Sequence, residues 1–221
     1  LGLKGIPDIS ESINIYRDIQ ILGYTNGKLH IPYVNTKRGV ELIRDAKKRN
    51  LDITASTSLA HLIFSDKDIN EFNTNLKLNP PLRSEIDCKS VKEGLIDGTI
   101  DYLTSMHEPL DLDNKKVVFD LATPGSIGLE SVFGNMCNNF TLEKTIDILT
   151  RNKSIFEIED HPIEKGSYAD LTLFNPDKSY EFSNEHILST SKNCAYLGTK
   201  LKGIVYGSIN NNNSTLNSSW T

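Results

Sequence analysis

Polar side chains that could bind a small ligand follow two short apolar runs near the middle of the chain. Asn79 comes after the run 75–78 and precedes two prolines, and His107 comes shortly after the run 100–104. A run with helical spacing, 84–97, separates them. If both runs are strands of a parallel sheet, their carboxyl ends lie at the edge where α/β folds build sites. Asn and Pro also favour turns, so Asn79 alone indicates no more than a turn.

A second candidate segment, 123–130, is rich in glycine and contains Pro124, Gly125 and Gly128. Glycine lets the backbone come close to another group, so N–H groups here could approach a ligand. The same residues could simply turn the chain. The segment therefore adds Pro124 and Gly125 to the candidate binding residues, with a plain turn as the alternative.

The elements that must position these residues alternate between strand and helix. Helices are predicted at 9–23, at 84–97, at 129–133 and at 142–149, and a further helix is predicted to start after Thr36, which caps it. Strands are predicted at 28–34, 51–56, 75–78 and 100–105. Strands that alternate with helices indicate βαβ units and a parallel sheet. Beyond residue 161, short runs at 170–174, 180–182 and 201–207 predict a small separate β layer, and the Asn- and Ser-rich tail is expected to be disordered.

Composition narrows the classes of partner. The 221 residues carry a formal net charge of −5, which argues against a nucleic-acid-binding surface. Three widely spaced cysteines indicate free thiols in a reducing compartment. No apolar run is long enough for a membrane span, so a cytoplasmic protein is expected. The chain opens without Met on a turn-like segment, and we interpret it as a fragment or a processed piece.

Taken together, five motifs resemble the C-terminal half of a dihydroorotase of the amidohydrolase superfamily. They occur in the family's order as Asn79-Pro-Pro-Leu-Arg83, Asp97-Gly-Thr-Ile-Asp101, His107-x-Pro109, Pro124-Gly-x-x-Gly-Leu-Glu130 and Gly166-x-x-Ala-Asp-Leu-Thr-Leu-Phe174. The resemblance covers about residues 1–207. It implies an α/β fold: the C-terminal half of a metal-dependent-hydrolase (β/α)8 TIM barrel plus strands of a small β-sandwich. The expected domains are 1–158 for the barrel half, 159–208 for the sandwich strands and 209–221 for a disordered tail.

The chain departs from that family at the residues that do its chemistry. Tyr33 stands where the sixth strand should end in a metal-binding His, and Met106 stands where the eighth strand should supply an Asp that binds metal and acts as general base. A phenol, with a reference pKa of about 10, is a poor ligand near neutral pH, and a thioether cannot act as a base. Leu110 replaces a final substrate-binding His. The resemblance is therefore to a degenerate, dihydroorotase-like paralogue.

Two other histidines do not restore the site. His30 lies three residues before Tyr33, on the opposite face of the predicted strand, and is expected to be packed or to face a helix. His61 is expected in a loop and is not a metal ligand by the family pattern. No catalytic residue and no metal ligand are thus predicted in this chain, although the family uses zinc. By resemblance, the substrate-binding positions that remain are Asn79, Pro124, Gly125 and His107.

Three functional hypotheses remain open. The first is a catalytically impaired dihydroorotase-like chain of pyrimidine biosynthesis, which by resemblance would associate with aspartate carbamoyltransferase and with a missing N-terminal barrel half. The second is an active cyclic amidohydrolase, converting dihydroorotate to N-carbamoyl-aspartate with a rearranged metal site. The third is a small-molecule binding module. Metal analysis separates the first two, and a thermal shift with dihydroorotate or orotate tests the third.

Overall fold

The computed structural model describes every residue except 1, 4, 70, 160, 211 and 217–221. It divides into two compact units: Leu1–Leu129 with Ile187–Ala195, and Glu130–His186 with Tyr196–Thr221. The first unit carries all the predicted site residues. No helix in the described ranges is both long and apolar enough to cross a bilayer.

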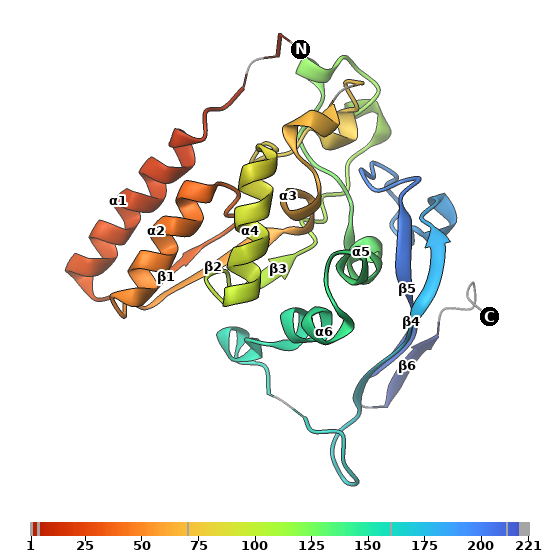
Figure 1. Cartoon of the computed structure of the whole chain (residues 1–221). Coiled ribbons are helices and arrows are strands. Elements are labelled where there is room, and N and C mark those ends of the chain that lie inside the picture. The colour runs from red at the N-terminus through yellow and green to blue at the C-terminus, as the bar shows by residue number, and fades with distance from the viewer. Residues whose placement is uncertain (1, 4, 70, 160, 211, 217–221) are drawn as a thin grey trace. The chain divides into compact units, whose positions relative to one another are not determined.

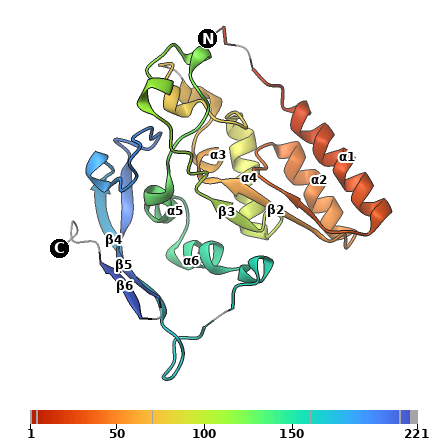
Figure 2. The same cartoon turned by 180° about the vertical axis from the view of Figure 1, so that it is seen from behind.

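The first unit is built on a parallel three-stranded sheet of β1 (Leu29–Ile31), β2 (Ile53–Ser58) and β3 (Tyr102–Thr104), in that order. Three helices alternate with these strands and lie in a row beside the sheet (Figures 1 and 2): α1 (Ile9–Thr25), α2 (Lys37–Lys48) and α4 (Glu85–Asp97). The predicted strand–helix alternation and parallel sheet are confirmed. Residues 28–34 and 100–105 contain parallel strands, with β2 between them.

Local sequence explains where the helices begin and end. The Thr36 hydroxyl accepts from the backbone N–H of Gly39 at the start of α2, as predicted. At the start of α4, Ser84 and Asp87 form a reciprocal capping box. That helix ends at Gly98, whose left-handed backbone favours glycine. Each helix buries an apolar face, which includes Ile15 in α1, Ile43 in α2 and Leu95 in α4.

The prediction of a strand at 75–78 is wrong. Residues Thr74–Leu76 form a 3₁₀ turn, which begins when the Asn73 side chain accepts from the N–H of Asn75. Leu76 and Leu78 are buried, as alternation predicts, but Lys77 pairs through its carbonyl with the N–H of Gly125 in a loop. Since no strand of the described residues lies alongside, the run forms no ladder. Asn79 therefore belongs to the long connection between β2 and α4.

His61 lies in a helix and not in the predicted loop. Residues 59–63 form a short helix, α3 (Leu59–Ile63), where a loop was predicted. Ser58 explains the difference, because its hydroxyl accepts from the N–H of His61 and starts a helical turn directly after β2. The other 3₁₀ helices are Asp66–Ile69, Leu112–Asn114, Phe119–Leu121, Leu129–Ser131, Lys153–Phe156 and Asn184–His186.

The second unit is an antiparallel sheet of β4 (Asp170–Glu181), β5 (Lys200–Asn210) and β6 (Asn213–Leu216), with α5 (Val132–Asn139) and α6 (Leu142–Thr150). The Thr141 cap of α6 is as predicted. The strands predicted at 170–174 and 180–182 are one strand with an irregular register between them.

Domain boundaries differ from the predicted 1–158, 159–208 and 209–221. Helices α5 and α6, assigned to the barrel half from the sequence, belong to the β unit. The place of α5 follows from packing: the Phe133 ring packs against Phe174 at a tilt, with centroids 4.9 Å apart, and a Cβ at Gly134 would meet the Leu201 side chain at 2.9 Å. The expected disordered tail is wrong for 209–210 and 213–216, because β5 and β6 pair there; residues 211 and 217–221 lie outside the described part.

Candidate functional site

Tyr33 and Met106 follow the carboxyl ends of β1 and β3, and both have an unusual backbone. Their φ angles are 54° and 46°, in the left-handed region that residues other than glycine seldom adopt. Met106 is only 5% exposed. Such conformations persist only when the surroundings enforce them, and they cluster at functional sites. The two positions singled out from the sequence thus share one edge of the sheet and one kind of constrained backbone.

A half-buried carboxylate holds the chain just after Tyr33. Glu11, on α1, accepts from the backbone N–H of Thr36 at 3.1 Å and from its hydroxyl at 2.8 Å. It also accepts from the N–H of Asn35. Burial raises the pKa of Glu11, and these hydrogen bonds oppose the rise. A Cβ at Gly39 would lie 2.5 Å from a Glu11 oxygen, so only glycine fits beside this clamp.

Arg83 and Asn35 tie the same loop to the Asn79-Pro-Pro segment. Asn35 donates through Nδ2 to the carbonyl of Pro81 at 3.2 Å, and Arg83 donates through Nε to Asn35 Oδ1 at 3.3 Å. Arg83 also donates to the carbonyl of Ile6. Both side chains are buried. The Arg83 guanidinium therefore links the end of β1, the proline segment and the residues before α1.

His61 is a neutral bridge behind the proline segment. Its Nε2 donates to the carbonyl of Pro80 at 2.9 Å, so its Nδ1 is the acceptor for the Ser58 hydroxyl at 2.7 Å. Burial lowers the pKa of His61 to about 4. The side chain is 2% exposed. His61 is consequently a structural residue that fixes Pro80, next to Asn79.

His107, Gly125 and Asn193 fasten the loop after β3. The N–H groups of Leu129 and Gly128 donate to His107 Nδ1 at 3.2 and 3.4 Å. Asn193 donates through Nδ2 to the carbonyl of Glu108 at 2.9 Å and accepts from the N–H of Leu110. The Gly125 N–H donates to Lys77, as described above, so in this chain that group has a protein partner.

Two cavities lie in the first unit, and Asn79 and Arg83 line both of them. The larger, about 850 Å³, is also lined by Pro124, Phe119 and Asp66. The smaller, about 340 Å³, is lined by Tyr33 and Glu11 among others. The structure thus brings Asn79 together with Pro124 on one side and with Tyr33 on the other. Among the described lining residues of these two cavities, Met106, His107 and Gly125 do not occur.

Glu11, Arg83 and Asn193 are residues whose importance the sequence did not reveal. Arg83 is the last residue of the motif Asn79-Pro-Pro-Leu-Arg83, so the sequence drew attention to its position. Nothing in that motif predicts its hydrogen bond to Asn35. Glu11 looks like an ordinary first-turn acid of a helix. Asn193 lies in a loop without a recognisable pattern. Their roles arise from long-range contacts that local spacing cannot show.

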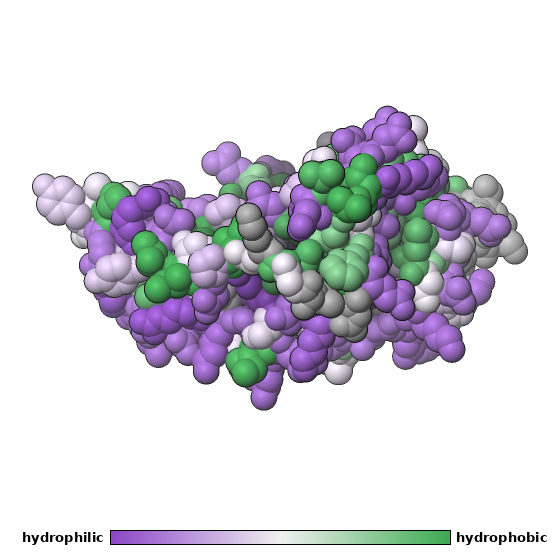
Figure 3. Space-filling model, turned by 90° about the horizontal axis from the view of Figure 1, so that it is seen from above, coloured by the Kyte–Doolittle hydropathy of each residue, from purple (hydrophilic) through white to green (hydrophobic). Residues whose placement is uncertain are grey.

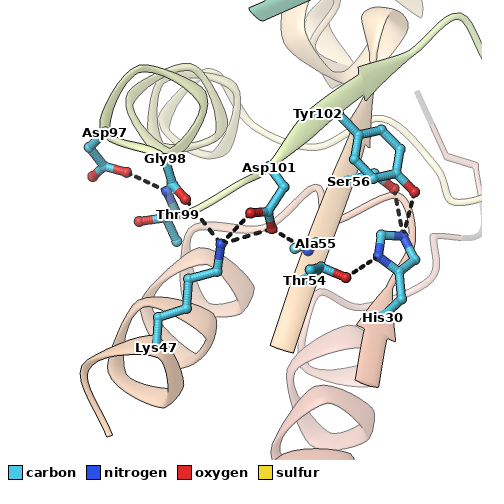
Figure 4. A network of polar contacts seen from close by, with 10 residues as sticks. All are labelled: His30, Lys47, Thr54, Ala55, Ser56, Asp97, Gly98, Thr99, Asp101 and Tyr102. Atoms are coloured by element: carbon cyan, nitrogen blue, oxygen red, sulfur yellow. Dashed lines mark hydrogen bonds and ion pairs between the residues drawn. The ribbon is translucent and has the colours of Figure 1, made fainter. Parts of the chain in front are cut away.

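The prediction that His30 is packed or helix-facing holds only in part, because the residue is exposed but its ring stacks on the Tyr102 ring, with centroids 5.3 Å apart. Its ring is exposed and contacts side chains from the neighbouring strands (Figure 4): Nδ1 lies 2.9 Å from Thr54 Oγ1, and Nε2 lies 3.0 Å from the Tyr102 hydroxyl and 3.2 Å from Ser56 Oγ. The contacts of His30 are with hydroxyl groups of β2 and β3, so this face of the sheet is polar there. Lys47 and Asp101 form a separate ion pair at 2.8 Å.

Known proteins resemble the chain in sequence and in fold. The dihydroorotase of Endomicrobium trichonymphae is 40% identical over 211 residues, covering 92% of this chain and 50% of that protein. The chain is a dihydroorotase homologue. It spans about half the length of the curated relatives it matches. No family model matches it.

Solved amidohydrolases share the fold of this dihydroorotase homologue. L-hydantoinase (dihydropyrimidinase) from Arthrobacter aurescens gives a TM-score of 0.83 at 21% identity, covering 95% of this chain and 49% of that one. The inactive dihydroorotase-like domain of the Chaetomium thermophilum CAD-like multifunctional protein gives 0.62 at 18% identity, covering 96% and 56%. These matches confirm the α/β fold of a partial TIM barrel.

The side chains of this homologue do not fit the zinc that the resemblance implies. Zinc sites in hydrolases are built from imidazole, carboxylate or thiolate ligands. Among the described residues, no group of three or more His, Cys, Asp or Glu side chains is placed to hold a metal ion. The strand ends offer the phenol of Tyr33 and the thioether of Met106 instead.

Proposed function

We propose that the chain belongs to a dihydroorotase-like protein of pyrimidine biosynthesis in which the metal-dependent hydrolysis is impaired. The observation that carries the proposal is the pair Tyr33 and Met106. Both sit at strand ends with left-handed backbones, held by their loops, yet neither brings a zinc ligand or a base. The strand ends keep a constrained backbone, and the side chains at these two positions bring neither a zinc ligand nor a base.

The chemical reason for the proposed impairment is that the side chain at position 106 would have to serve both as metal ligand and as general base. At the Met106 position the family places a carboxylate that both binds metal and takes the proton from the attacking water. A thioether carries no charge and has negligible basicity, so it supports neither role. Loss of a group with both roles costs on the order of 4 kcal/mol or more in the activation barrier.

A role in assembly fits such a chain. By family resemblance we propose aspartate carbamoyltransferase as a partner, together with the remaining half of the barrel. A solved protein of this fold is described as an inactive dihydroorotase-like domain of a multifunctional protein. That precedent supports the idea that the fold can serve without hydrolysis. Co-sedimentation with aspartate carbamoyltransferase tests the partner, and two independent sedimenting species would contradict it.

A second candidate function, binding of a small molecule, is favoured by the larger cavity. Asn79 and Pro124, two of the expected substrate-binding positions, both line it, and its volume of about 850 Å³ falls in the range of ligand sites. Asn79 is exposed to solvent, and its neighbour Pro80 is fixed by His61. A thermal shift with dihydroorotate or orotate that Asn79→Ala abolishes would support this function.

The proposed impairment is tested by restoring the missing side chains in the protein that contains this chain. The variant is Tyr33→His with Met106→Asp and Leu110→His, and the assay is dihydroorotate turnover. We expect negligible turnover from the unmodified protein and a measurable gain from the triple variant. Turnover by the unmodified protein at the rate of an active relative would establish the alternative, an enzyme with a rearranged metal site. Asn79→Ala in the triple variant serves as the control for a site that uses this cavity.

A further inference from the structure

The segment 111–124, which we call the strap, follows β3 and buries almost no apolar side chain. Among its residues, all of which the structure describes, only Lys115 and Ala122 are buried. Val118 and Leu121 are 67% and 75% exposed. Figure 3, which views the molecule from above, shows hydrophobic patches separated by hydrophilic ones, an ordinary protein surface. Apolar packing within the described chain therefore contributes little to holding the strap.

Lys115 fastens the strap through an ammonium group that lies between two backbone carbonyls. Its Nζ donates to the carbonyl of Thr74 at 2.9 Å and to that of Thr123 at 2.7 Å. The Thr74 hydroxyl donates back to the Lys115 carbonyl at 2.8 Å. Burying an ammonium group is costly unless hydrogen bonds replace its water, and these charge-assisted bonds do so. Lys115 thus joins the beginning and the end of the strap to Thr74.

Lys77 fastens the strap a second time, from the other side. Its Nζ donates to the carbonyls of Phe119 at 2.9 Å and Asp120 at 2.8 Å. The same Nζ lies 5.7 Å from the centroid of the Phe119 ring, within the range of a cation–π contact. The Lys77 carbonyl accepts from the N–H of Gly125 at 2.9 Å. Lys77 therefore holds the strap at Phe119 and at its last residue, Pro124.

The two lysines are held close together although their charges repel. Leu76 and Leu78, on either side of Lys77, are buried and anchor its backbone. Burial and the nearby Lys77 charge lower the pKa of Lys115 to about 8, so Lys115 is still mostly charged at neutral pH. Buried charges contribute little to stability by themselves, and fixing one arrangement of the chain is a role that they can serve.

The strap supplies part of the wall of the larger cavity. Phe119 and Pro124 line the cavity from the strap, and Lys77 and Asn79 line it from the preceding segment. The Phe119 ring also packs edge-to-face against Phe72, with centroids 6.5 Å apart. The two strap residues in this wall are thus the ones that Lys77 holds.

We propose that Lys77 and Lys115 are positioning residues, which hold the strap in place as a wall of the larger cavity. Without their hydrogen bonds the strap would open, because it buries no apolar side chain other than that of Ala122. The shape of the cavity beside Asn79 would then be lost. The effect on a ligand rests on the proposed small-molecule function, whereas the position of the strap does not.

Hydrogen–deuterium exchange, measured by mass spectrometry on the protein that contains this chain, tests the position of the strap. In Lys77→Met and Lys115→Met, we expect peptides with the amides of Thr123 and Gly125 to exchange about tenfold faster or more, because the strap opens more often. Lys116→Met, at an exposed neighbour in the strap, is the matched control and should exchange as the wild type does. Unchanged exchange in the strap, or an equal rise in peptides of α2, would overturn the proposal.

Lys77→Arg separates a positioning role from a loss of packing. Arginine keeps the charge and several N–H donors, whereas methionine keeps only an apolar stem. We expect Lys77→Arg to bring the exchange of the strap most of the way back to the wild-type rate. Exchange as fast as in Lys77→Met would show that the bonds to Phe119 and Asp120 do not hold the strap, and the proposal would fail.

Binding of orotate, measured by titration calorimetry, tests the effect on a ligand. We expect Lys77→Met to weaken binding about tenfold or more and Lys116→Met to leave it unchanged. Equal binding by the wild type and Lys77→Met would overturn the role of the strap as a wall of the site. If the wild type does not bind orotate, the small-molecule function fails, and the exchange measurements alone decide whether the lysines hold the strap.

Discussion

Two sets of residues lie at the carboxyl edge of the parallel sheet, and they differ in whether they keep the interactions expected of a site. Tyr33 and Met106 occupy the strand ends but lack the chemistry expected there. The residues behind them, by contrast, are tied into hydrogen bonds: Glu11 to the loop after β1, His61 to Pro80 and Asn193 to the loop after β3. The frame that positions a strand end is therefore independent of the side chain that the strand end presents.

The largest effect is expected from removing His61. His61→Ala leaves the carbonyl of Pro80 without its donor and opens a cavity, so the free energy of unfolding should fall by ~2–4 kcal/mol. Chemical denaturation measures the loss. The control is His30→Ala at an exposed histidine, which we expect to cost less than ~1 kcal/mol. Equal costs would show that the buried bridge has no special role.

His61 also predicts an acid dependence. Because its pKa is lowered from 6.5 to about 4 in the folded protein, the unfolded chain binds more protons between these values. Stability should therefore fall as pH decreases from 6.5 towards 4. The fall should be smaller in His61→Ala, and identical pH profiles for the two proteins would refute this assignment.

Gly125 gives the next largest effect. Its φ of 135° strains any other residue, and a Cβ would lie 2.7 Å from a Glu108 oxygen. Gly125→Ala should therefore cost ~2 kcal/mol or more in unfolding free energy, from strain and crowding together. Gly98→Ala is a matched control, because φ is 81° but nothing lies within 4 Å of the added Cβ. A smaller cost at Gly125 than at Gly98 would argue against close packing after β3.

A smaller effect, seen at alkaline pH, comes from Lys115. Its Nζ donates to the carbonyls of Thr74 and Thr123, and burial together with the nearby Lys77 charge lowers its pKa from 10.5 to about 8. Between these values the unfolded chain binds more protons, so Lys115 should make stability rise with pH. The free energy of unfolding of the wild type, measured relative to that of Lys115→Met, should therefore rise with pH over this range. Lys116→Met, at the exposed neighbour, should leave the profile of the wild type unchanged.

The smallest effect is expected at a strand end itself. If the frame is independent of the side chain it presents, Tyr33→His should change the free energy of unfolding by less than ~1 kcal/mol. Chemical denaturation of Tyr33→His and of His61→Ala, each compared with the wild type, measures the two losses of unfolding free energy. A cost at Tyr33 as large as that at His61 would mean that Tyr33 is part of the frame.

Sequence reasoning predicted the parallel sheet and the caps at Thr36 and Thr141, because these depend on short-range pattern. Tyr33 and Met106 were singled out only by resemblance to the family. Sequence reasoning failed at 75–78, where the alternation of Leu76 and Leu78 was real but no neighbouring strand existed. It also missed the Glu11 clamp, which joins residues 24 and 25 positions apart. Contacts of that kind depend on the folded arrangement and leave no local signature.

The zinc content of the unmodified protein that contains this chain tests the central claim most directly. The protein is purified, dialysed against zinc and then against metal-free buffer, and its metal is measured beside that of the Tyr33→His, Met106→Asp variant. The account predicts more retained zinc per protein in the variant than in the unmodified protein. Zinc retained equally by both, together with turnover of dihydroorotate by the unmodified protein, would contradict it.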